Sequence, residues 1–173
     1  MHHLKTVHVS RPPRFGATLS LKARAIAALA RRDYSRKELH QKLAGFSDSD
    51  EDLQALLDLL ESKKLLSNAR FADAFINQRQ AKFGASRLVY ELEQHGLDPE
   101  LIQAQKQQLV QTENQRALVV WAKRFGSPPG SALEKSKQIR FLASRGFSPE
   151  VYRWLEARDF APIDEVELDR GMV

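Results

Sequence analysis

Three glycines, each followed by a large apolar residue, recur along the chain at an almost constant interval. Gly45-Phe46, Gly96-Leu97 and Gly146-Phe147 are separated by 51 and then 50 residues. A glycine with an apolar residue after it is a common end of an α-helix, because glycine adopts the left-handed conformation without strain. Three such ends at one period indicate an internal repeat. We therefore expect a helix to end at a left-handed glycine in each of the three places.

Helix start signals fill the segments between these glycines. Ser35, with Glu38 three residues later, has the spacing of a capping box, in which each side chain bonds a free backbone amide of the other residue. Further apolar runs at helical spacing follow candidate caps, which are Ser20, Ser67 or Asn68, Asp98 and Ser148. Pro99 and Pro149 suit the first helical position.

Composition favours helices over strands. Leu and Ala together make 43 of the 173 residues, whereas Val, Ile and Thr together make 17. Leu and Ala are strong helix formers, and β-branched residues favour strands. We predict an all-α fold of three tandem three-helix repeats. Because one repeat is too small to bury a satisfactory core alone, the repeats should stack into an elongated, curved molecule.

The predicted division of the chain has five parts. A flexible basic arm covers residues 1–18, and the three repeats cover residues 19–66, 67–111 and 112–158. An acidic tail covers residues 159–173, where five acids and one proline favour an extension over a tenth core helix. This tail either contacts the basic surface in competition with DNA or serves only solubility.

Several kinds of site are excluded or disfavoured by the sequence. The chain has no cysteine, which excludes disulfides, cysteine nucleophiles and thiolate zinc sites. It has no apolar run long enough to span a membrane, and its first residues lack the apolar core of a signal peptide. Its five histidines form no helical metal motif, and no glycine-rich phosphate loop is present. We therefore expect a protein that is not an enzyme and needs no cofactor or metal.

Charge is distributed in blocks along the chain. The formal net charge is +5, but residues 1–44 have a balance of +8, residues 116–146 one of +6 and residues 147–173 one of −4. Stripes of Lys and Arg on helices can neutralise phosphates and release counterions. The candidate residues for binding a partner or nucleic acid are Arg24, Arg31, Arg32, Arg36, Lys37, Arg79, Arg87, Lys123, Arg124, Lys137, Arg140 and Arg145. The alternative for each of them is an ordinary solvated helix face.

The middle of the chain resembles a known family. Residues 67–76 read Ser-Asn-Ala-Arg-Phe-Ala-Asp-Ala-Phe-Ile, followed by Arg79, Gly84, Arg87-Leu88, Glu91-Leu92 and Gly96-Leu97. The first repeat adds Tyr34-Ser35-Arg36-Lys37-Glu38-Leu39, and the third adds residues 121–126, Lys137, Arg140-Phe141-Leu142 and Arg145-Gly146-Phe147. In this order, over residues 19–158, the motifs resemble those of the RecX regulators of bacterial recombination.

The resemblance implies a small cytoplasmic protein of tandem three-helix repeats, and we expect it to be a monomer. Proteins of this kind bind the RecA recombinase, particularly its nucleoprotein filament on DNA, and restrain its strand exchange, ATP hydrolysis and co-protease activity without catalytic residues of their own. Three positions differ from the family pattern. Asn68 stands where Asp is common, and Val89 and His95 stand where many relatives have basic residues, which weakens the positive face of the middle repeat.

Two functions of other classes remain open on the sequence. One is an independent DNA-binding module whose three-helix units imitate helix-turn-helix domains. The cations weigh against it, because they are distributed rather than concentrated in one recognition helix. The other is a purely structural helical adaptor. Binding to DNA alone, to recombinase alone and to the filament would distinguish the three.

Overall fold

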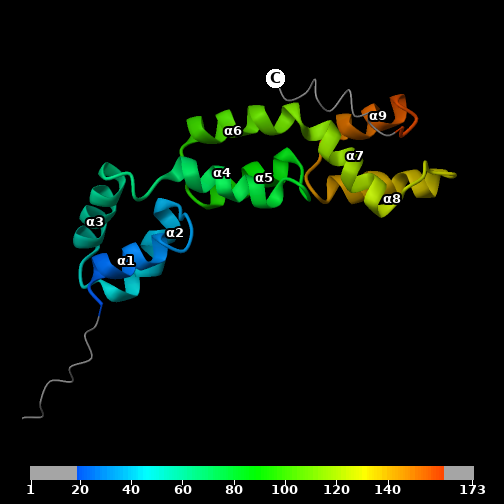
Figure 1. The fold of residues 1–173 in the computed structure, drawn as a ribbon. Helices are drawn as coiled ribbons and strands as arrows, with labels where there is room; N and C mark the ends of the chain where they lie inside the picture. Colours follow the sequence, from blue (N-terminus) through cyan, green and yellow to red (C-terminus); the bar gives the residue numbers. More distant parts are fainter. Residues whose placement is uncertain (1–18, 162–173) are drawn as a thin grey trace, which may run out of the picture.

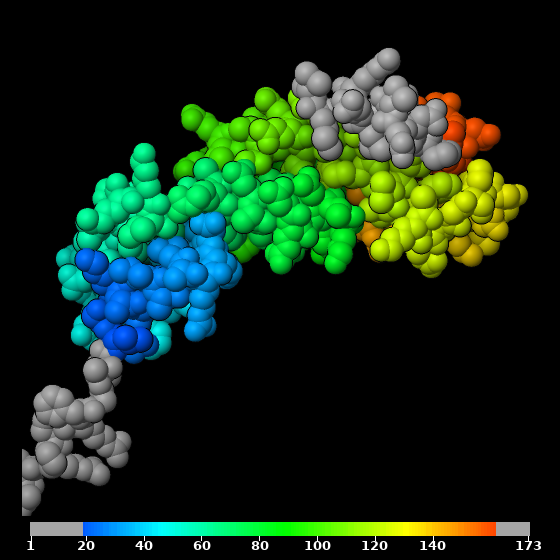
Figure 2. All heavy atoms as spheres, in the orientation of Figure 1, coloured from blue at the N-terminus to red at the C-terminus, as the bar shows by residue number. Residues whose placement is uncertain are grey.

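The computed structural model describes residues 19–161, and this part of the chain is helical throughout. Figure 1 shows the helices in three groups that follow one another along a curved, elongated path, and Figure 2 shows the same arc with its side chains. Residues 19–161 form nine α-helices, one short 3-10 helix and no strand. The predicted all-α fold of three three-helix repeats is confirmed. The predicted basic arm and residues 162–173 of the predicted tail lie outside the described residues.

Each unit contributes three α-helices in sequence order. The first unit contains α1 (Leu21–Leu29), α2 (Arg36–Leu43), the 3-10 helix η1 (Ala44–Phe46) and α3 (Asp50–Ser62). The second contains α4 (Asn68–Arg79), α5 (Ala85–Gln94) and α6 (Pro99–Gln111). The third contains α7 (Glu113–Arg124), α8 (Ala132–Ala143) and α9 (Pro149–Ala157).

Serine hydroxyls begin several of these helices, as the sequence predicts. The Oγ atoms of Ser20, Ser35 and Ser67 accept hydrogen bonds from the backbone amides three residues later, at 3.1–3.3 Å. The other half of the predicted capping box is wrong. The Glu38 carboxylate does not return to the start of α2 but makes a two-pronged bond to the Arg32 guanidinium, at 2.7 and 2.8 Å. Two charge-assisted hydrogen bonds to a guanidinium are stronger than one hydrogen bond from a backbone amide, so the carboxylate binds Arg32.

Each unit has its own apolar core, built from the stripe that repeats at helical spacing. The first unit buries mainly leucines, which include Leu39, Leu43, Leu53, Leu57 and Leu60. The second unit buries Phe71, Phe75, Leu88 and Leu92 with their neighbours. The third buries Trp121, Leu142, Phe147, Val151 and Leu155. Three separate cores in a row explain why the molecule is elongated rather than spherical.

The packed part of the third unit extends past the boundary predicted at residue 158. The Phe160 ring stacks on the Trp121 indole with centroids 4.6 Å apart and meets the Tyr152 ring edge at 5.8 Å. Its backbone amide donates to the Leu155 carbonyl, at 2.9 Å. Phe160 therefore packs against the core of the third unit, although two charged residues, Arg158 and Asp159, precede it.

Two of the three repeat glycines adopt the predicted conformation. Gly96 and Gly146 have φ angles of +70° and +82°. The prediction for Gly45 is wrong, because Gly45 lies in η1 and is not among the residues with positive φ. A Cβ atom built at Gly45 would meet nothing within 4 Å. At Gly96 and Gly146 the preceding unit packs against the turn, through Lys37 and Arg87 respectively, whereas within the described residues no unit precedes the first.

The second and third units meet where the start of α5 lies against the end of α8. The Gly84 amide donates to the Arg145 carbonyl at 2.9 Å, and the Ser86 amide donates to the Gly146 carbonyl at 3.2 Å. A Cβ atom at Gly84 would lie 2.2 Å from the Gly146 oxygen, so the two backbones touch directly. The free amides that begin α5 are thus satisfied by carbonyls of the turn that ends α8.

Two charged residues of α7 complete this junction. Glu113 is buried, and its Oε1 accepts a 2.7 Å hydrogen bond from the Ala85 amide at the start of α5. The Arg116 guanidinium donates to the carbonyls of Gln80, Phe83 and Leu109, at 2.6–3.0 Å. Burial lowers the pKa of Arg116, and the Glu113 charge acts in the opposite direction. The two side chains join α7 to both ends of the loop between α4 and α5.

The first and second units meet in the equivalent way, with side chains in place of backbone. The start of α2 lies against the end of α5, where the Ser35 hydroxyl donates to the His95 carbonyl at 3.0 Å. The Lys37 ammonium donates to the Gln94 carbonyl at 2.9 Å. His95 and Arg145 each immediately precede the left-handed glycine of their unit, so they occupy the same place in the repeat.

Contacts to the start of α4 strengthen the first junction. The Arg36 amide donates to the Asn68 side-chain oxygen at 2.9 Å, and Arg70 pairs with Asp33 at 3.2 Å. Asn68 therefore supplies an acceptor to α2 while Ser67 caps α4. The His95 ring packs edge-on against Phe71 and Phe75, with centroids 4.9 and 5.2 Å away. His95 thus serves packing at a position where the family resemblance suggests a basic residue.

Candidate partner-binding surface

The twelve candidate cations fall into two classes in the structure, according to whether the fold already engages their charge. We call a cation engaged when its side chain forms an ion pair or bonds a neighbouring unit, and this class comprises Arg32, Arg36, Lys37, Arg79 and Arg87. The remaining residues have no ion pair within residues 19–161, and they gather in the first and third units, at the two ends of the arc.

In the first unit, two arginines are held by carboxylates from other helices or turns. Arg32 pairs with Glu38 at 2.7 Å, and this hydrogen bond raises the pKa of Arg32 and lowers that of Glu38. Arg36 bonds Asp58 and Glu61 of α3, at 2.7 and 2.6 Å. Arg36 therefore ties α2 to α3. Both pairs reduce the positive charge that these arginines offer a partner.

In the second unit, one carboxylate engages both candidate arginines. Glu91 accepts from Arg79 at 2.7 Å and from Arg87 at 3.1 Å. The two guanidinium groups also lie over aromatic rings, Arg79 over Phe75 at 4.5 Å and Arg87 over Phe83 at 4.1 Å. The charge of the middle unit is thus partly neutralised, which leaves it the least basic part of the predicted surface.

The first unit contains a pocket that brings Arg24 and Arg31 together. The pocket has a volume of about 290 Å³ and lies between α1 and the end of α2. Its apolar wall comprises Leu19, Ala27, Ala28, Tyr34, Leu43 and Phe46, and its cations are Arg24, Arg31 and Lys42. The Arg24 guanidinium lies over the Phe46 ring at 4.1 Å and donates to the Leu19 carbonyl at 3.0 Å. No carboxylate of the described residues lines the pocket.

Lys42 and Phe46 are pocket residues that lie outside the predicted set. Lys42 is exposed near the end of α2, and its ammonium lies 5.9 Å from the centre of the Tyr34 ring. Phe46 follows the first repeat glycine and is 57% exposed, whereas its counterparts Leu97 and Phe147 are buried. The difference between Phe46 and its two buried counterparts is visible only after the units are packed.

The third unit carries the second group of unengaged cations. Lys123 and Arg124 are exposed at the end of α7, and Lys137 and Arg140 are exposed on α8. Arg145 follows α8, with its guanidinium 3.7 Å from the centre of the Phe141 ring and a hydrogen bond to the Phe141 carbonyl at 3.3 Å. Arg145 is therefore oriented by its own helix end, whereas the other four are exposed, with Arg124 also 5.4 Å from the centre of the Phe125 ring.

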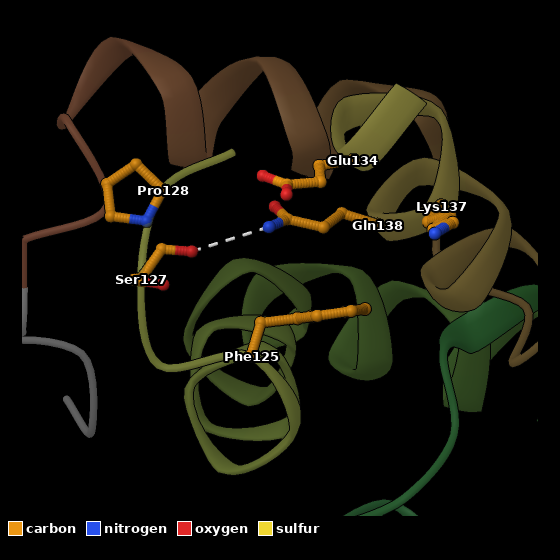
Figure 3. Close-up of a pocket in the computed structure, with 6 residues that line it drawn as sticks. All are labelled: Phe125, Ser127, Pro128, Glu134, Lys137 and Gln138. Atoms are coloured by element: carbon orange, nitrogen blue, oxygen red, sulfur yellow. Dashed lines mark hydrogen bonds between the residues drawn. The ribbon is translucent and has the colours of Figure 1, made fainter. Parts of the chain in front are cut away.

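Lys137 lies beside a second pocket, drawn in Figure 3. Phe125, Ser127, Pro128, Glu134 and Gln138 line it with Lys137, around about 280 Å³. The Gln138 side chain donates to the Ser127 carbonyl at 3.3 Å and accepts from the Trp121 indole at 2.8 Å. The Glu134 carboxylate accepts from the Gly130 amide at 2.7 Å. Gln138 and Glu134 thus each bond the backbone of the loop between α7 and α8, and these bonds hold the loop against α8.

Other kinds of site are not found in the part of the chain that the structure describes. Among residues 19–161, no group of three or more His, Asp or Glu side chains is placed to hold a metal ion. Over the same residues, no helix has the length and apolar character needed to cross a membrane.

Comparison with protein families matches two of the three units. The model of the third three-helix domain of RecX matches residues 111–153, and that of the second three-helix domain of RecX matches residues 67–104. Both matches lie within helical units that the structure separates.

Similar proteins cover nearly the whole chain. A protein named regulatory protein RecX from Ralstonia pickettii strain 12J is 44% identical over 89% of this chain and 94% of its own length. A second protein of that name, from Ralstonia nicotianae, is 46% identical over 77% of this chain and 84% of its own length.

Solved structures share the fold. The crystal structure of RecX from Lactobacillus salivarius matches with a TM-score of 0.68 at 15% identity, over 80% of this chain and 94% of that one. A crystal structure of a regulatory protein RecX matches with a TM-score of 0.63 at 18% identity, over 82% of this chain and 75% of that one. At such identities these two matches bear on the fold alone. Taken with the close relatives, the family models and the three stacked units, they lead to one conclusion: this chain belongs to the RecX family of regulatory proteins.

Proposed function

We propose that this protein is a non-catalytic regulator that binds the RecA recombinase, in particular its nucleoprotein filament on DNA, and inhibits its strand exchange, ATP hydrolysis and co-protease activity. In this proposal it acts in the cytoplasm and as a monomer. Membership of the RecX family supports a regulatory role. The partner, the inhibition, the compartment and the oligomeric state are what the resemblance of the sequence to this family implies.

One observation carries the proposal beyond the family name. The three units are joined by the same contact, in which the start of the second helix of one unit lies on the last turn of the second helix of the next. This contact extends the molecule into an arc, with unengaged cations at its two ends. A long partner with a repeating surface suits such an arc better than a small ligand does.

The mechanism we propose is bridging. Each end of the arc contacts a different protomer or stretch of the filament, and each contact alone is weak. Because the two ends are linked, the second contact forms at a high effective concentration once the first has formed. A bridge between protomers resists the relative motions that couple ATP hydrolysis to strand exchange.

Binding measurements on three partners test this proposal. The full chain is titrated with RecA alone, with single-stranded DNA alone, and with the RecA filament on the same DNA. Preference for the filament, together with slower ATP hydrolysis, is the expected result. Equal binding to bare DNA and to the filament would instead favour the independent DNA-binding module, and binding without any effect on hydrolysis would favour the adaptor.

A charge-removal variant tests the two ends of the arc. Replacing Arg24, Arg31, Lys137 and Arg140 by Gln preserves helix propensity and removes four unengaged charges. We expect weaker filament binding, less inhibition of ATP hydrolysis and a flatter dependence of binding on salt. The matched control replaces Lys63, Lys64, Lys82 and Lys106 by Gln, which removes the same charge from exposed lysines outside the candidate set. Equal inhibition by both variants at every salt concentration would show that the four candidates are an ordinary solvated face.

The role of the acidic tail is a separate proposal, in which the tail competes with DNA for the basic surface. A deletion that tests it should begin at residue 162, because Phe160 packs into the third unit. We expect deletion of residues 162–173 to strengthen binding to DNA, most visibly at low salt. Unchanged binding across salt concentrations would leave solubility as the role of the tail.

A further inference from the structure

The pocket of the first unit combines features that select one kind of ligand. It is lined by Arg24, Arg31 and Lys42, and its wall is made of Leu19, Leu43 and other apolar groups. We propose that this pocket binds an acidic peptide segment that carries an aliphatic side chain, presented by the protein partner. The inference deepens the proposed function and rests on it for the identity of the protein that presents the segment.

No ion pair neutralises the cations of the pocket within residues 19–161. Arg24 donates to one backbone carbonyl and covers Phe46, and neither it nor Arg31 or Lys42 forms an ion pair within residues 19–161. The carboxylate on the same helix as Lys42 is Glu38, which Arg32 holds with two hydrogen bonds. The Arg32 hydrogen bond lowers the pKa of Glu38, and the Lys42 charge contributes a smaller effect in the same direction. Three cations around one depression without a lining carboxylate leave a local positive charge that an acidic ligand would neutralise.

The apolar wall gives the ligand a second requirement. Leu43 and Ala28 are buried at the base, and Leu19 and Phe46 are 58% and 57% exposed at the rim. Exposed large apolar side chains beside a depression favour a ligand that covers them. A carboxylate alone would leave this wall in water, so the ligand that suits the pocket has an aliphatic side chain between its acids.

The aromatic rings argue against nucleic acid as the ligand. Single-stranded nucleic acid is held without sequence preference by rings whose faces are open to stacking bases. Here the Phe46 ring has the Arg24 guanidinium over it at 4.1 Å. Tyr34 is 8% exposed and has the Arg32 guanidinium over it at 3.7 Å. Because a guanidinium lies over one face of each ring, less ring surface is open to a stacking base. A peptide instead meets the pocket with an aliphatic group and carboxylates.

Peptide binding to the full chain tests the inference directly. The probe is a short fluorescent synthetic peptide in which leucines alternate with pairs of glutamates, and binding is followed by anisotropy. We expect the variant R24Q/R31Q/K42Q to bind this peptide about tenfold more weakly than the parent does. The matched control, K63Q/K82Q/K106Q, should bind like the parent, because it loses the same charge elsewhere. Circular dichroism establishes that both variants keep the helix content of the parent.

Two further probes decide which features of the ligand matter. A peptide with glutamine in place of every glutamate should lose binding, and one with serine in place of every leucine should bind several-fold more weakly than the original. Equal binding of the leucine and serine peptides would overturn the assigned apolar requirement. Equal weakening of the pocket and control variants would overturn the site. An oligothymidine whose binding depends on the three cations while the acidic peptide fails to bind would overturn the peptide assignment in favour of nucleic acid.

Failure of this inference is distinguishable from failure of the proposed function. Filament binding and inhibition of ATP hydrolysis are measured on the same samples. A parent protein that inhibits hydrolysis but does not bind the peptide keeps the proposed function and loses the pocket assignment. If the parent binds the peptide through the three cations but neither binds nor inhibits the recombinase, the pocket assignment stands. In that case the recombinase is not the protein that presents the segment.

Discussion

The two junctions between units bring the same elements together but use different hydrogen-bonding groups. In both, the start of a second helix lies on the left-handed glycine turn that ends the second helix of the next unit. Between the second and third units the contact is backbone to backbone, with Gly84 against Gly146. Between the first and second it is made by side chains, from Ser35 and Lys37 to the carbonyls of His95 and Gln94.

The difference indicates where the arc can bend. A backbone contact supported by the buried Glu113 and by Arg116 has few alternative geometries. At the first junction the hydrogen bond from Lys37 is made by an exposed, long side chain, which can keep its bond over a wider range of angles because its bonds rotate. We infer that the second and third units move as one body and that the first unit adjusts its direction relative to them. Such an adjustment suits the bridging mechanism that we propose.

The largest expected effect is from Gly84→Ala, which tests the close backbone contact. Gly84 has a φ of −77°, so alanine is allowed by its backbone, but the new Cβ atom would meet the Gly146 backbone at 2.2–2.3 Å. We expect a loss of about 3 kcal/mol in the free energy of unfolding, from overpacking that the backbone cannot relieve. Urea unfolding is followed by circular dichroism for all helices and by fluorescence of Trp121 and Trp154 for the third unit.

Gly45→Ala is the matched control for this substitution. A Cβ atom at Gly45 has open space around it, and Gly45 does not have a positive φ. We expect the free energy of unfolding to change by less than about 1 kcal/mol, with a gain rather than a loss favoured. If the two alanine variants were equally stable, the rigid contact between the second and third units would not exist as described.

The next largest effect is expected at Arg116, which tests the buried support of the same junction. Arg116→Met removes hydrogen bonds to three carbonyls and leaves the buried Glu113 without its nearby cation. The expected loss is about 2–3 kcal/mol, since hydrogen bonds from charged groups are the stronger ones. Arg124→Met, on the exposed end of the same helix, should cost less than about 0.5 kcal/mol. Thermal unfolding of both variants provides the measurement, and equal melting temperatures would contradict the assigned role.

A smaller effect is expected at Ser35, which tests the side-chain junction. The Ser35 hydroxyl is fully buried, caps α2 and donates to the His95 carbonyl, so Ser35→Ala removes two interactions. We expect a cost of about 1–2 kcal/mol. Ser62→Ala, whose exposed hydroxyl bonds only its own helix, is the control and should be close to neutral.

Hydrogen exchange of the backbone amides shows which helices the Ser35→Ala substitution destabilises. Amides of α2 should exchange faster in Ser35→Ala, while those of α8 keep the parent rate, because the second junction is independent of the first. Equal acceleration in α2 and α8 would mean that the two junctions are coupled and that the molecule is a single cooperative body.

The smallest expected effect is a pH dependence confined to the first unit. The Arg32 hydrogen bond lowers the pKa of Glu38 below its ordinary value of 4.5. Because the folded pKa is the lower one, the pair contributes stability above the ordinary value, and that contribution is lost as the pH falls below it. The side chains of Arg32 and Glu38 are 50% and 26% exposed, so the contribution should be below about 1 kcal/mol.

Urea unfolding at neutral pH and at acid pH, on the parent and on Glu38→Gln, measures this term. The variant should lose less stability on acidification than the parent does, and the difference should appear in the circular dichroism of the whole chain rather than in the tryptophan fluorescence of the third unit. An identical loss in parent and variant would show that other carboxylates carry the acid sensitivity.

Most of the fold was predictable because helix patterns are local. The glycine period, the serine caps and the apolar stripes each depend on residues within one or two turns, and these gave the repeat, the all-α class and the position of most helix ends. Gly45 shows the limit of that inference. Its sequence matches Gly96 and Gly146, but those two are left-handed and have another unit packed against them, whereas Gly45 has neither feature, and the packed neighbour is not a local property.

The candidate site was predictable only as a set of charges. Arg24 and Arg31 were predicted, and the structure places both in one pocket with Lys42, while Arg36 and Lys37 of the same set instead tie helices and units together. Spacing along a helix reveals carboxylates within one turn of a cation. It cannot reveal Asp58 and Glu61, which are more than twenty residues from Arg36 and reach it from α3.

The sequence by itself determined the helices, their three-fold repetition and the membership of a family, because backbone hydrogen bonds within a helix and the stripe that it buries depend on near neighbours. Only the tertiary structure decided which cations remain available, which of the three repeat glycines are left-handed and which groups make each junction. Each of these depends on atoms that approach from another helix or another unit. Gly84 and Gly146 touch although 62 residues separate them, and no local pattern encodes that distance.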